Sequence, residues 1–124
     1  MSTQKETVPA PAWNQAELLE RVDNDQVLLQ ELLAIFKEDF PRTMQSLESA
    51  VSAADLKNTS RLSHTLKGML SSLGGARAAA AASKLESLAS DGEEAALKDA
   101  LATLESEAAL LLPELNAYRA EVRH

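Results

Sequence analysis

The sequence contains no cysteine among its 124 residues. Disulfide bonds and zinc sites with cysteine ligands are therefore excluded, and the absence fits a protein of the reducing cytosol. Aromatic residues are also scarce, because the chain has one Trp, one Tyr and two Phe. Leu and Ala supply most of its hydrophobic residues, which make up 45% of the chain. Since both residue types favour helices, we expect a helical core.

Long hydrophobic runs are missing as well. No stretch approaches the roughly 20 apolar residues that cross a bilayer, and the N-terminus lacks the apolar centre of a signal peptide. These features predict a cytoplasmic protein without membrane insertion. The length suits one domain. Residues 1–12 are polar and hold two prolines, so we expect them to form a flexible tail or linker, with the folded domain at residues 13–124.

Basic residues are fewer than acidic ones, twelve against nineteen, and the net charge of −7 argues against nucleic-acid binding. Residues 56–85 are an exception because they contain basic residues and no acidic one. The basic residues of this island are Lys57, Arg61, Lys67, Arg77 and Lys84. Two interpretations remain open. The island binds an anionic ligand or an acidic partner, or it is the solvated face of a helix.

Apolar residues recur at helical spacing along most of the chain, and strand-type alternation is absent. A short helix should begin directly after Asn14, which is a good N-cap residue. Four long helices are expected to follow. Their predicted spans are 26–53, 55–73 and 76–89, with a last helix that carries apolar residues from 97 to 122.

Helix breakers separate these segments. Gly74-Gly75 and Asp91-Gly92 are expected to end the two helices that precede them. Pro41 and Pro113 lie inside helical patterns, so a kink is predicted at each, or a brief interruption at Pro41. The pattern predicts an all-α fold, an antiparallel up-and-down four-helix bundle with a short extra N-terminal helix.

The helix expected at 55–73 has two distinct faces. On a helical wheel its apolar side holds Thr59, Leu62, Leu66, Met69, Leu70 and Leu73. His64 lies opposite the centre of that side and should face solvent. Arg61 and Lys67 lie three residues before and three residues after it, and Gly68 lies four residues after it.

These neighbours give the histidine a possible chemistry. A neutral imidazole is a competent nucleophile, and nearby cations can neutralise a phosphoryl group. Gly68 costs roughly 1 kcal/mol against Ala in a helix, but it leaves open space beside the imidazole. Each residue alone has a plainer explanation: a surface His is usually inert, Lys67 would be solvated, and Gly68 could serve close packing. Three serines, at positions 60, 63 and 71, are expected to be small polar residues that flank the site.

Two segments of this helix carry a family resemblance, HTLKG at 64–68 and the pair Leu73-Gly74. They resemble the signature of histidine-containing phosphotransfer (HPt) domains, which runs H-x-[IL]-K-G and then reaches an apolar-Gly pair. The similarity extends over nearly the whole chain. It implies phosphorylation of the His64 imidazole, with Lys67 stabilising the phosphoryl charge and Gly68 giving steric access. One departure concerns packing, because Met69 and Leu70 stand where small residues often follow the Lys-Gly pair.

The resemblance implies a phosphorelay intermediate. Such a protein accepts a phosphoryl group on His64 from a receiver-domain aspartate and passes it to another receiver domain. Its partners would be response-regulator receiver domains, a hybrid histidine kinase, or both, and it would act as a monomer. The chain has no Gly-rich nucleotide-binding segment, so no kinase activity is expected. No cofactor or metal site is expected either, and Mg²⁺ would come from the partner receiver. The alternative from another class is a helical-bundle adaptor without phosphoryl chemistry.

Two apolar residues of the second expected helix fall off its main stripe. Leu28 and Ile35 are one heptad apart and therefore share a face. They are candidates for docking a partner near His64, or they pack under the short first helix; the sequence leaves both open.

Overall fold

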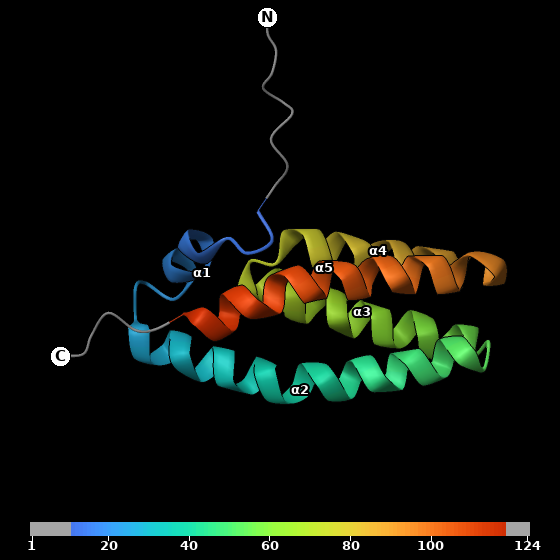
Figure 1. The fold of residues 1–124 in the computed structure, drawn as a ribbon, viewed down its shortest axis with the longest axis horizontal. Helices are drawn as coiled ribbons and strands as arrows, with labels where there is room; N and C mark the ends of the chain where they lie inside the picture. Colours follow the sequence, from blue (N-terminus) through green and yellow to red (C-terminus); the bar gives the residue numbers. More distant parts are fainter. Residues whose placement is uncertain (1–10, 119–124) are drawn as a thin grey trace, which may run out of the picture.

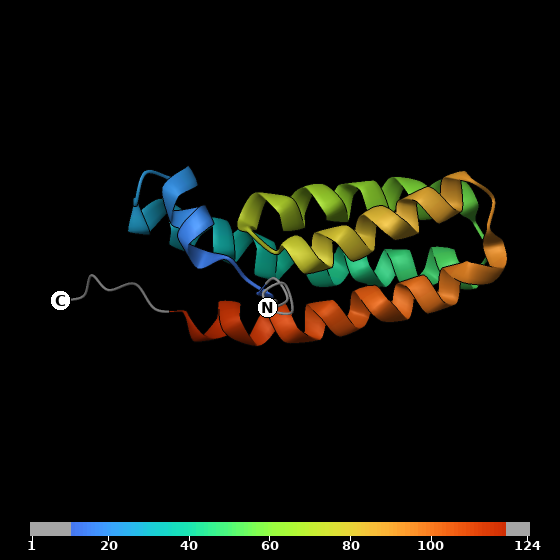
Figure 2. The ribbon, with the colours of Figure 1, turned by 90° about the horizontal axis from the view of Figure 1, so that it is seen from above.

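The computed structural model describes residues 11–118 of the chain, and every regular element in that range is a helix. A short helix, α1 (Gln15–Arg21), is followed by α2 (Gln26–Ser52) and α3 (Leu56–Leu73). Next come α4 (Ala76–Ser90), a 3-10 turn η2 (Glu94–Ala96) and α5 (Leu97–Ala117). The four long helices form an antiparallel bundle, with α1 at one end (Figures 1 and 2). The predicted fold class is confirmed.

Three polar residues set the starts of the first three helices. The side chain of Asn14 accepts a hydrogen bond from the Glu17 backbone N–H at 3.0 Å. Asp25 caps α2 and Asp55 caps α3 in the same way. Each cap satisfies one of the N–H groups that a helix start leaves without a backbone partner.

The two prolines are accommodated inside continuous helices. Pro41 lies within α2 and Pro113 within α5, and neither interrupts its helix. Both are exposed, as are Lys37 and Ala109 four residues before them. The carbonyl groups that lose a helical hydrogen bond belong to residues on the exposed side of each helix, where water can replace the lost donor and lower the cost of the proline. Instead of breaking, α2 curves along its length (Figure 1).

The end of the last helix differs from the prediction. α5 ends at Ala117, and Tyr118 has an extended backbone. The Tyr118 ring meets Trp13 edge to face with centroids 5.8 Å apart, and its hydroxyl donates a hydrogen bond to Gln26. These tertiary contacts favour the extended conformation of Tyr118 and therefore the end of α5 at Ala117. Val122 lies outside the described residues, as does His124.

α1 and the two residues before it contact the C-terminal end of α3. The indole Nε1–H of Trp13 donates to the Leu73 carbonyl at 2.9 Å, and the Asn14 N–H donates to the Gly74 carbonyl at 2.9 Å. Arg21 donates to the carbonyls of Ser71 and Ser72 at 2.9 and 2.7 Å. The α1 segment thus donates hydrogen bonds to carbonyl groups at the end of α3, where helix carbonyls lack intrahelical partners or have few.

The core is largely aliphatic and runs through the bundle. Its fully buried large side chains are mostly leucines from all five α-helices, and they are Leu18, Leu29, Leu33, Leu47, Leu66, Leu70, Leu85, Leu97, Leu104, Leu111 and Leu115. The Ala-rich α4 adds small buried residues, among them Ala78 and Ala82. No helix within residues 11–118 is both long enough and apolar enough to cross a membrane.

Candidate functional site

His64 lies near the middle of α3 with its side chain 67% exposed. The core-facing side of the same helix buries Leu66, Leu70 and Leu73, so the two faces of α3 differ as the sequence predicts. The exposed imidazole is accessible to another protein. The predicted solvent exposure of His64 is therefore confirmed.

A carboxylate from the neighbouring helix contacts this histidine. Glu86 of α4 places Oε2 3.0 Å from His64 Nδ1 and Oε1 3.3 Å from Lys67 Nζ. The Glu86 side chain is 25% exposed, so it is partly shielded from water. A carboxylate accepts hydrogen bonds only, so neutral His64 donates through Nδ1–H and carries its lone pair on Nε2.

The role of Glu86 could not be predicted from the sequence, because the residues that it contacts lie on another helix. Glu86 is 22 residues from His64 in the sequence. Two contacts fix the antiparallel register that joins them. Ser60 Oγ lies 3.0 Å from Ser90 Oγ. His64 is four residues after Ser60 on α3, and its partner Glu86 is four residues before Ser90 on α4. One signal was present: Glu86 is the only acidic residue of α4.

Ser63 corrects one expectation about the site. It is expected to flank the site as a small polar residue, but it is fully buried, as is Thr59 one turn earlier. Its position shows why, since Ser63 is four residues after Thr59 and three before the buried Leu66. Ser60 is half-buried and Ser71 is exposed, so these two lie on the outer side as predicted.

Gly68 lies one turn after His64 on the exposed face of α3. A Cβ atom built at this glycine would have no neighbouring heavy atom within 4 Å. Close helix packing therefore does not explain the glycine. The space beside the imidazole is open.

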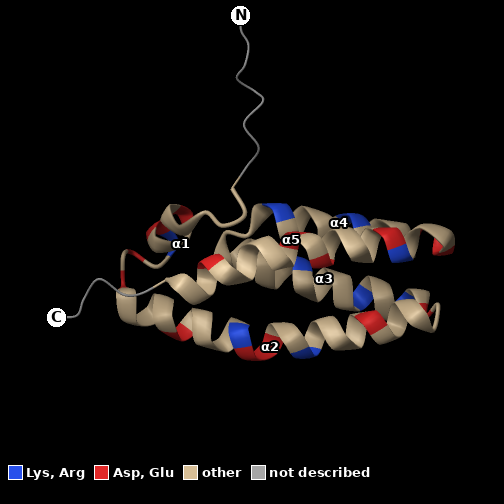
Figure 3. Cartoon of the chain, in the orientation of Figure 1, with Lys and Arg blue, Asp and Glu red and all other residues tan. Residues whose placement is uncertain are grey.

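The basic island is divided between two sides of the molecule. Arg77 is turned to α5, where its Nε lies 2.9 Å from Oε1 of Glu107. Lys84 also lies toward α5. The remaining three basic residues, Lys57, Arg61 and Lys67, share α3 with His64, and α3 contains no acidic residue (Figure 3).

An apolar hollow of 160 Å³ lies where α1, α2 and the end of α3 meet. Its lining residues are Leu18, Leu32, Ile35, Phe36, Asp39, Met69, Ser72 and Leu73. Ile35 is 56% exposed and Leu28 is 39% exposed, so α1 does not cover them. Met69 and Leu70, which stand where the family often has small residues, both fit the packing: Leu70 is buried in the core and Met69 lines this hollow.

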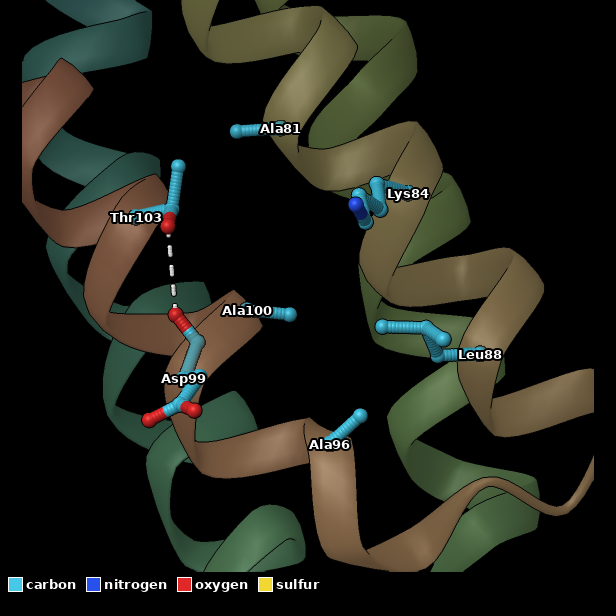
Figure 4. A pocket seen from close by; sticks show the side chains of 7 residues that line it. All are labelled: Ala81, Lys84, Leu88, Ala96, Asp99, Ala100 and Thr103. Carbon is cyan, nitrogen blue, oxygen red and sulfur yellow. Dashed lines mark hydrogen bonds between the residues drawn. The ribbon is translucent and has the colours of Figure 1, made fainter.

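A larger hollow of 340 Å³ separates α4 from α5 (Figure 4). It is lined by Ala81, Lys84, Leu88, Ala96, Asp99, Ala100 and Thr103. His64 is not among these residues, and Thr103 donates its hydroxyl hydrogen bond to the Asp99 carbonyl. Among residues 11–118 no group of three or more His, Asp or Glu side chains could hold a metal ion. The α3–α4 surface is therefore the candidate site.

Within residues 11–118 the antiparallel bundle exposes one histidine, His64, and a carboxylate of the neighbouring helix contacts both this histidine and a lysine. This arrangement suits the class of proteins that use an exposed imidazole as a reactive group. The Hpt domain model matches residues 31–121, which is most of the chain. The chain therefore belongs to the Hpt domain family. Comparison with curated proteins and with solved structures gave no match.

Membership in this family establishes the general activity. Hpt domains transfer phosphoryl groups on a histidine in two-component phosphorelays, and they interact with receiver domains and kinases. They are phosphotransfer carriers and not kinases. The resemblance seen in the HTLKG segment is thereby confirmed.

Proposed function

We propose that this chain is a phosphorelay intermediate that accepts a phosphoryl group on His64 from the aspartyl phosphate of one receiver domain and passes it to another. The observation that carries the proposal is the contact of His64 Nδ1 with Glu86, at 3.0 Å, on an imidazole that is 67% exposed. The contact holds the ring by one nitrogen and leaves Nε2 as the nucleophile.

The transfer step conserves atoms and charge. The lone pair of Nε2 forms a bond to phosphorus, the bond from phosphorus to the receiver aspartate breaks, and the carboxylate leaves with the electron pair. The imidazole becomes cationic as the N–P bond forms, and the Glu86 carboxylate beside Nδ1–H stabilises that charge, as a carboxylate does for the histidine of a hydrolase triad. Transfer to the next receiver is the reverse reaction with a new aspartate.

Lys67 would stabilise the charge of the phosphoryl group. Its ammonium lies 3.3 Å from Glu86 and one helical turn from His64. A lysine has a flexible stem and three donors, so it can keep one contact with Glu86 and direct another to a phosphoryl oxygen. Gly68 would give the receiver room to bring its aspartyl phosphate to Nε2, because the position four residues after His64 carries no side chain and has open space around it.

The remaining parts of the proposal concern what the partner supplies. The receiver domain would dock on the apolar hollow that Ile35 and Met69 line, which begins five residues beyond His64 along α3. The receiver would also provide the Mg²⁺ that phosphoryl transfer from aspartate needs. His64, Glu86, Lys67 and Gly68 all belong to one chain, so a monomer suffices. We place the exchange in the cytoplasm, where the ATP-dependent kinases that feed such relays have their nucleotide.

Incubation with a phosphorylated receiver domain tests this function. We expect the wild-type chain to take up acid-labile phosphate, and His64→Gln to take up none while keeping its helicity and melting temperature, because the side chain is exposed. ATP alone should label neither protein. Since His124 is retained in the variant, persistent uptake would move the acceptor away from His64. A wild-type chain that takes up no phosphate would be an adaptor.

A further inference from the structure

A second hollow lies on the other side of His64, where the start of α3 meets the end of α4. Its volume is 550 Å³ and it opens to solvent. The lining residues are Leu56, Lys57, Ser60, Arg61, Ala89, Ser90 and Gly92. The Ser60–Ser90 contact forms part of its wall, one turn of α3 before the His64–Glu86 contact. The hollow and the histidine thus lie along the same seam between two helices.

Two cations and no carboxylate line this hollow. Lys57 forms no ion pair within residues 11–118. Arg61 donates one hydrogen bond from Nη2 to the Asn58 side chain at 3.0 Å, which leaves most of its five donors for another acceptor. Lys57, Arg61 and His64 are spaced four and three residues apart, so they share the exposed face of α3.

Acidic side chains near the hollow are directed elsewhere or lie outside its lining. Asp55 accepts hydrogen bonds from the backbone and the side chain of Asn58. Asp91, Glu93 and Glu94 follow α4 and are exposed, but none of them lines the hollow. The lining therefore presents positive charge in a chain whose net charge is −7.

The two hollows that flank His64 along α3 have opposite characters. Toward the C-terminal end of the helix the surface is apolar around Met69, and toward the N-terminal end it is basic around Lys57 and Arg61. Lys57 precedes His64 by seven residues, or about 10 Å along a helix. A partner that buries about 800 Å² on each side would cover His64 and both hollows together.

We propose that this basic hollow is a second docking point for the receiver domain, and that it binds a surface segment of the receiver with exposed Asp or Glu side chains. The inference rests on the proposed function. Charge complementarity selects this occupant, because a lining with two cations and no carboxylate attracts an acidic surface and repels a basic one. With apolar contact at one end and ionic contact at the other, only one orientation of the receiver matches both hollows. The basic hollow would therefore discriminate between receivers.

A pair of double charge reversals tests this docking point. Lys57→Glu with Arg61→Glu alters the hollow, and Lys84→Glu with Lys98→Glu changes the net charge equally on α4 and α5, away from it. From a panel of purified receiver domains, the one that phosphorylates the wild-type chain fastest serves as donor. We expect the Michaelis constant for that donor to rise about tenfold in the first variant, with a weaker dependence on salt, and to change less than about twofold in the second.

Labelling of His64 by phosphoramidate, a small phosphodonor, separates this inference from the function on which it rests. The ratio of receiver-driven to phosphoramidate-driven labelling should fall about tenfold in the Lys57/Arg61 variant, because only the receiver needs docking. Equal ratios in both double variants would overturn the docking point. A wild-type chain that neither donor labels would refute the proposed function instead. If the reversal variant does not fold, Lys57→Gln with Arg61→Gln should still raise the Michaelis constant about threefold, and an unchanged constant there also overturns the proposal.

Discussion

At the scale of single residues, the Glu86 carboxylate is shared between His64 and Lys67. One oxygen contacts the imidazole at 3.0 Å and the other contacts the ammonium at 3.3 Å. A charge that holds both groups can orient the ring and also position the lysine. Both effects would act before any partner arrives, so the site is organised in advance for the transfer.

Replacing Glu86 with Gln tests this role. The amide can still accept a hydrogen bond from Nδ1–H, but it no longer balances the charge of the cationic ring, so we expect transfer from a phosphorylated receiver to slow about tenfold, equivalent to about 1.4 kcal/mol. ¹⁵N NMR should show a smaller fraction of the Nδ1–H tautomer of His64. Glu93→Gln, an exposed acid just after α4, is the control. Unchanged rate and tautomer in the Glu86 variant would limit this carboxylate to binding Lys67.

A substitution at Gly68 tests whether this glycine gives the receiver access to His64 or serves helix packing. Because a Cβ at this position meets nothing within 4 Å, Gly68→Gln should keep the fold and add up to about 1 kcal/mol of stability through helix propensity. The longer side chain should obstruct the receiver, so receiver-driven transfer should drop sharply. Melting temperature and transfer rate are measured on one sample. A stable variant with a normal rate would contradict the access argument, and an unfolded one would contradict the open geometry.

At the scale of elements, α1 and α3 are joined through a glycine. Gly74 has a positive φ of 89°, and a Cβ there would lie 2.6 Å from the Asn14 carbonyl oxygen. The Leu73-Gly74 pair of the family signature therefore has a structural reason in this chain. Leu73 is buried and accepts the Trp13 hydrogen bond, and Gly74 turns the chain where α1 is attached.

Two glycines with similar backbones allow this junction to be measured. Gly92 has a φ of 75° but open space around it, so Gly92→Ala should cost only the backbone strain, about 1 kcal/mol. Gly74→Ala adds a clash with the backbone of Asn14, and we expect a loss of about 3 kcal/mol in urea unfolding. Similar losses for both variants would show that α1 can move away from the added Cβ without a further loss of unfolding free energy.

The sequence predicted the elements well, because their signals are local. Asn14, Asp25 and Asp55 mark helix starts through bonds that span three residues, and glycine marks the end of α3. Tyr118 was placed wrongly in the last helix because its ring meets Trp13, more than one hundred residues earlier. Ser63 was expected to flank the site, but its spacing of four residues from Thr59 and three from Leu66 places it on the buried side of α3.

At the scale of the whole molecule, the site depends on how helices align. His64, Lys67 and Gly68 could be found from one helical wheel, because they belong to one helix. Glu86 required the register between α3 and α4, which tertiary packing sets and a single sequence does not state. The division of the basic island had the same origin, since Arg77 turns toward Glu107 on α5.

The bundle is closed by α2 and α5, where two acidic residues meet. Glu105 of α5 has a raised pKa because its side chain hydrogen-bonds to Glu48 of α2, and partial burial and the Glu48 charge raise it further. A carboxyl group with a raised pKa in the folded state binds its proton more tightly there than in the unfolded chain. The pair therefore contributes stability below the unfolded pKa, and that stability is lost as the pH rises through the folded pKa of Glu105.

Glu105→Gln keeps a hydrogen-bond donor for Glu48 and removes the charge repulsion across this seam. At pH 7 the variant should melt about 1–2 °C above the wild type, a small gain because the pair is mostly exposed to solvent. At pH 4 the wild-type carboxyl is largely protonated and resembles the amide, so the difference should shrink toward zero. Glu114→Gln, at an exposed position of the same helix, controls for the lower net charge. A gain equal in both variants, or one that does not change with pH, would show that the two acids do not interact when α2 and α5 close the bundle.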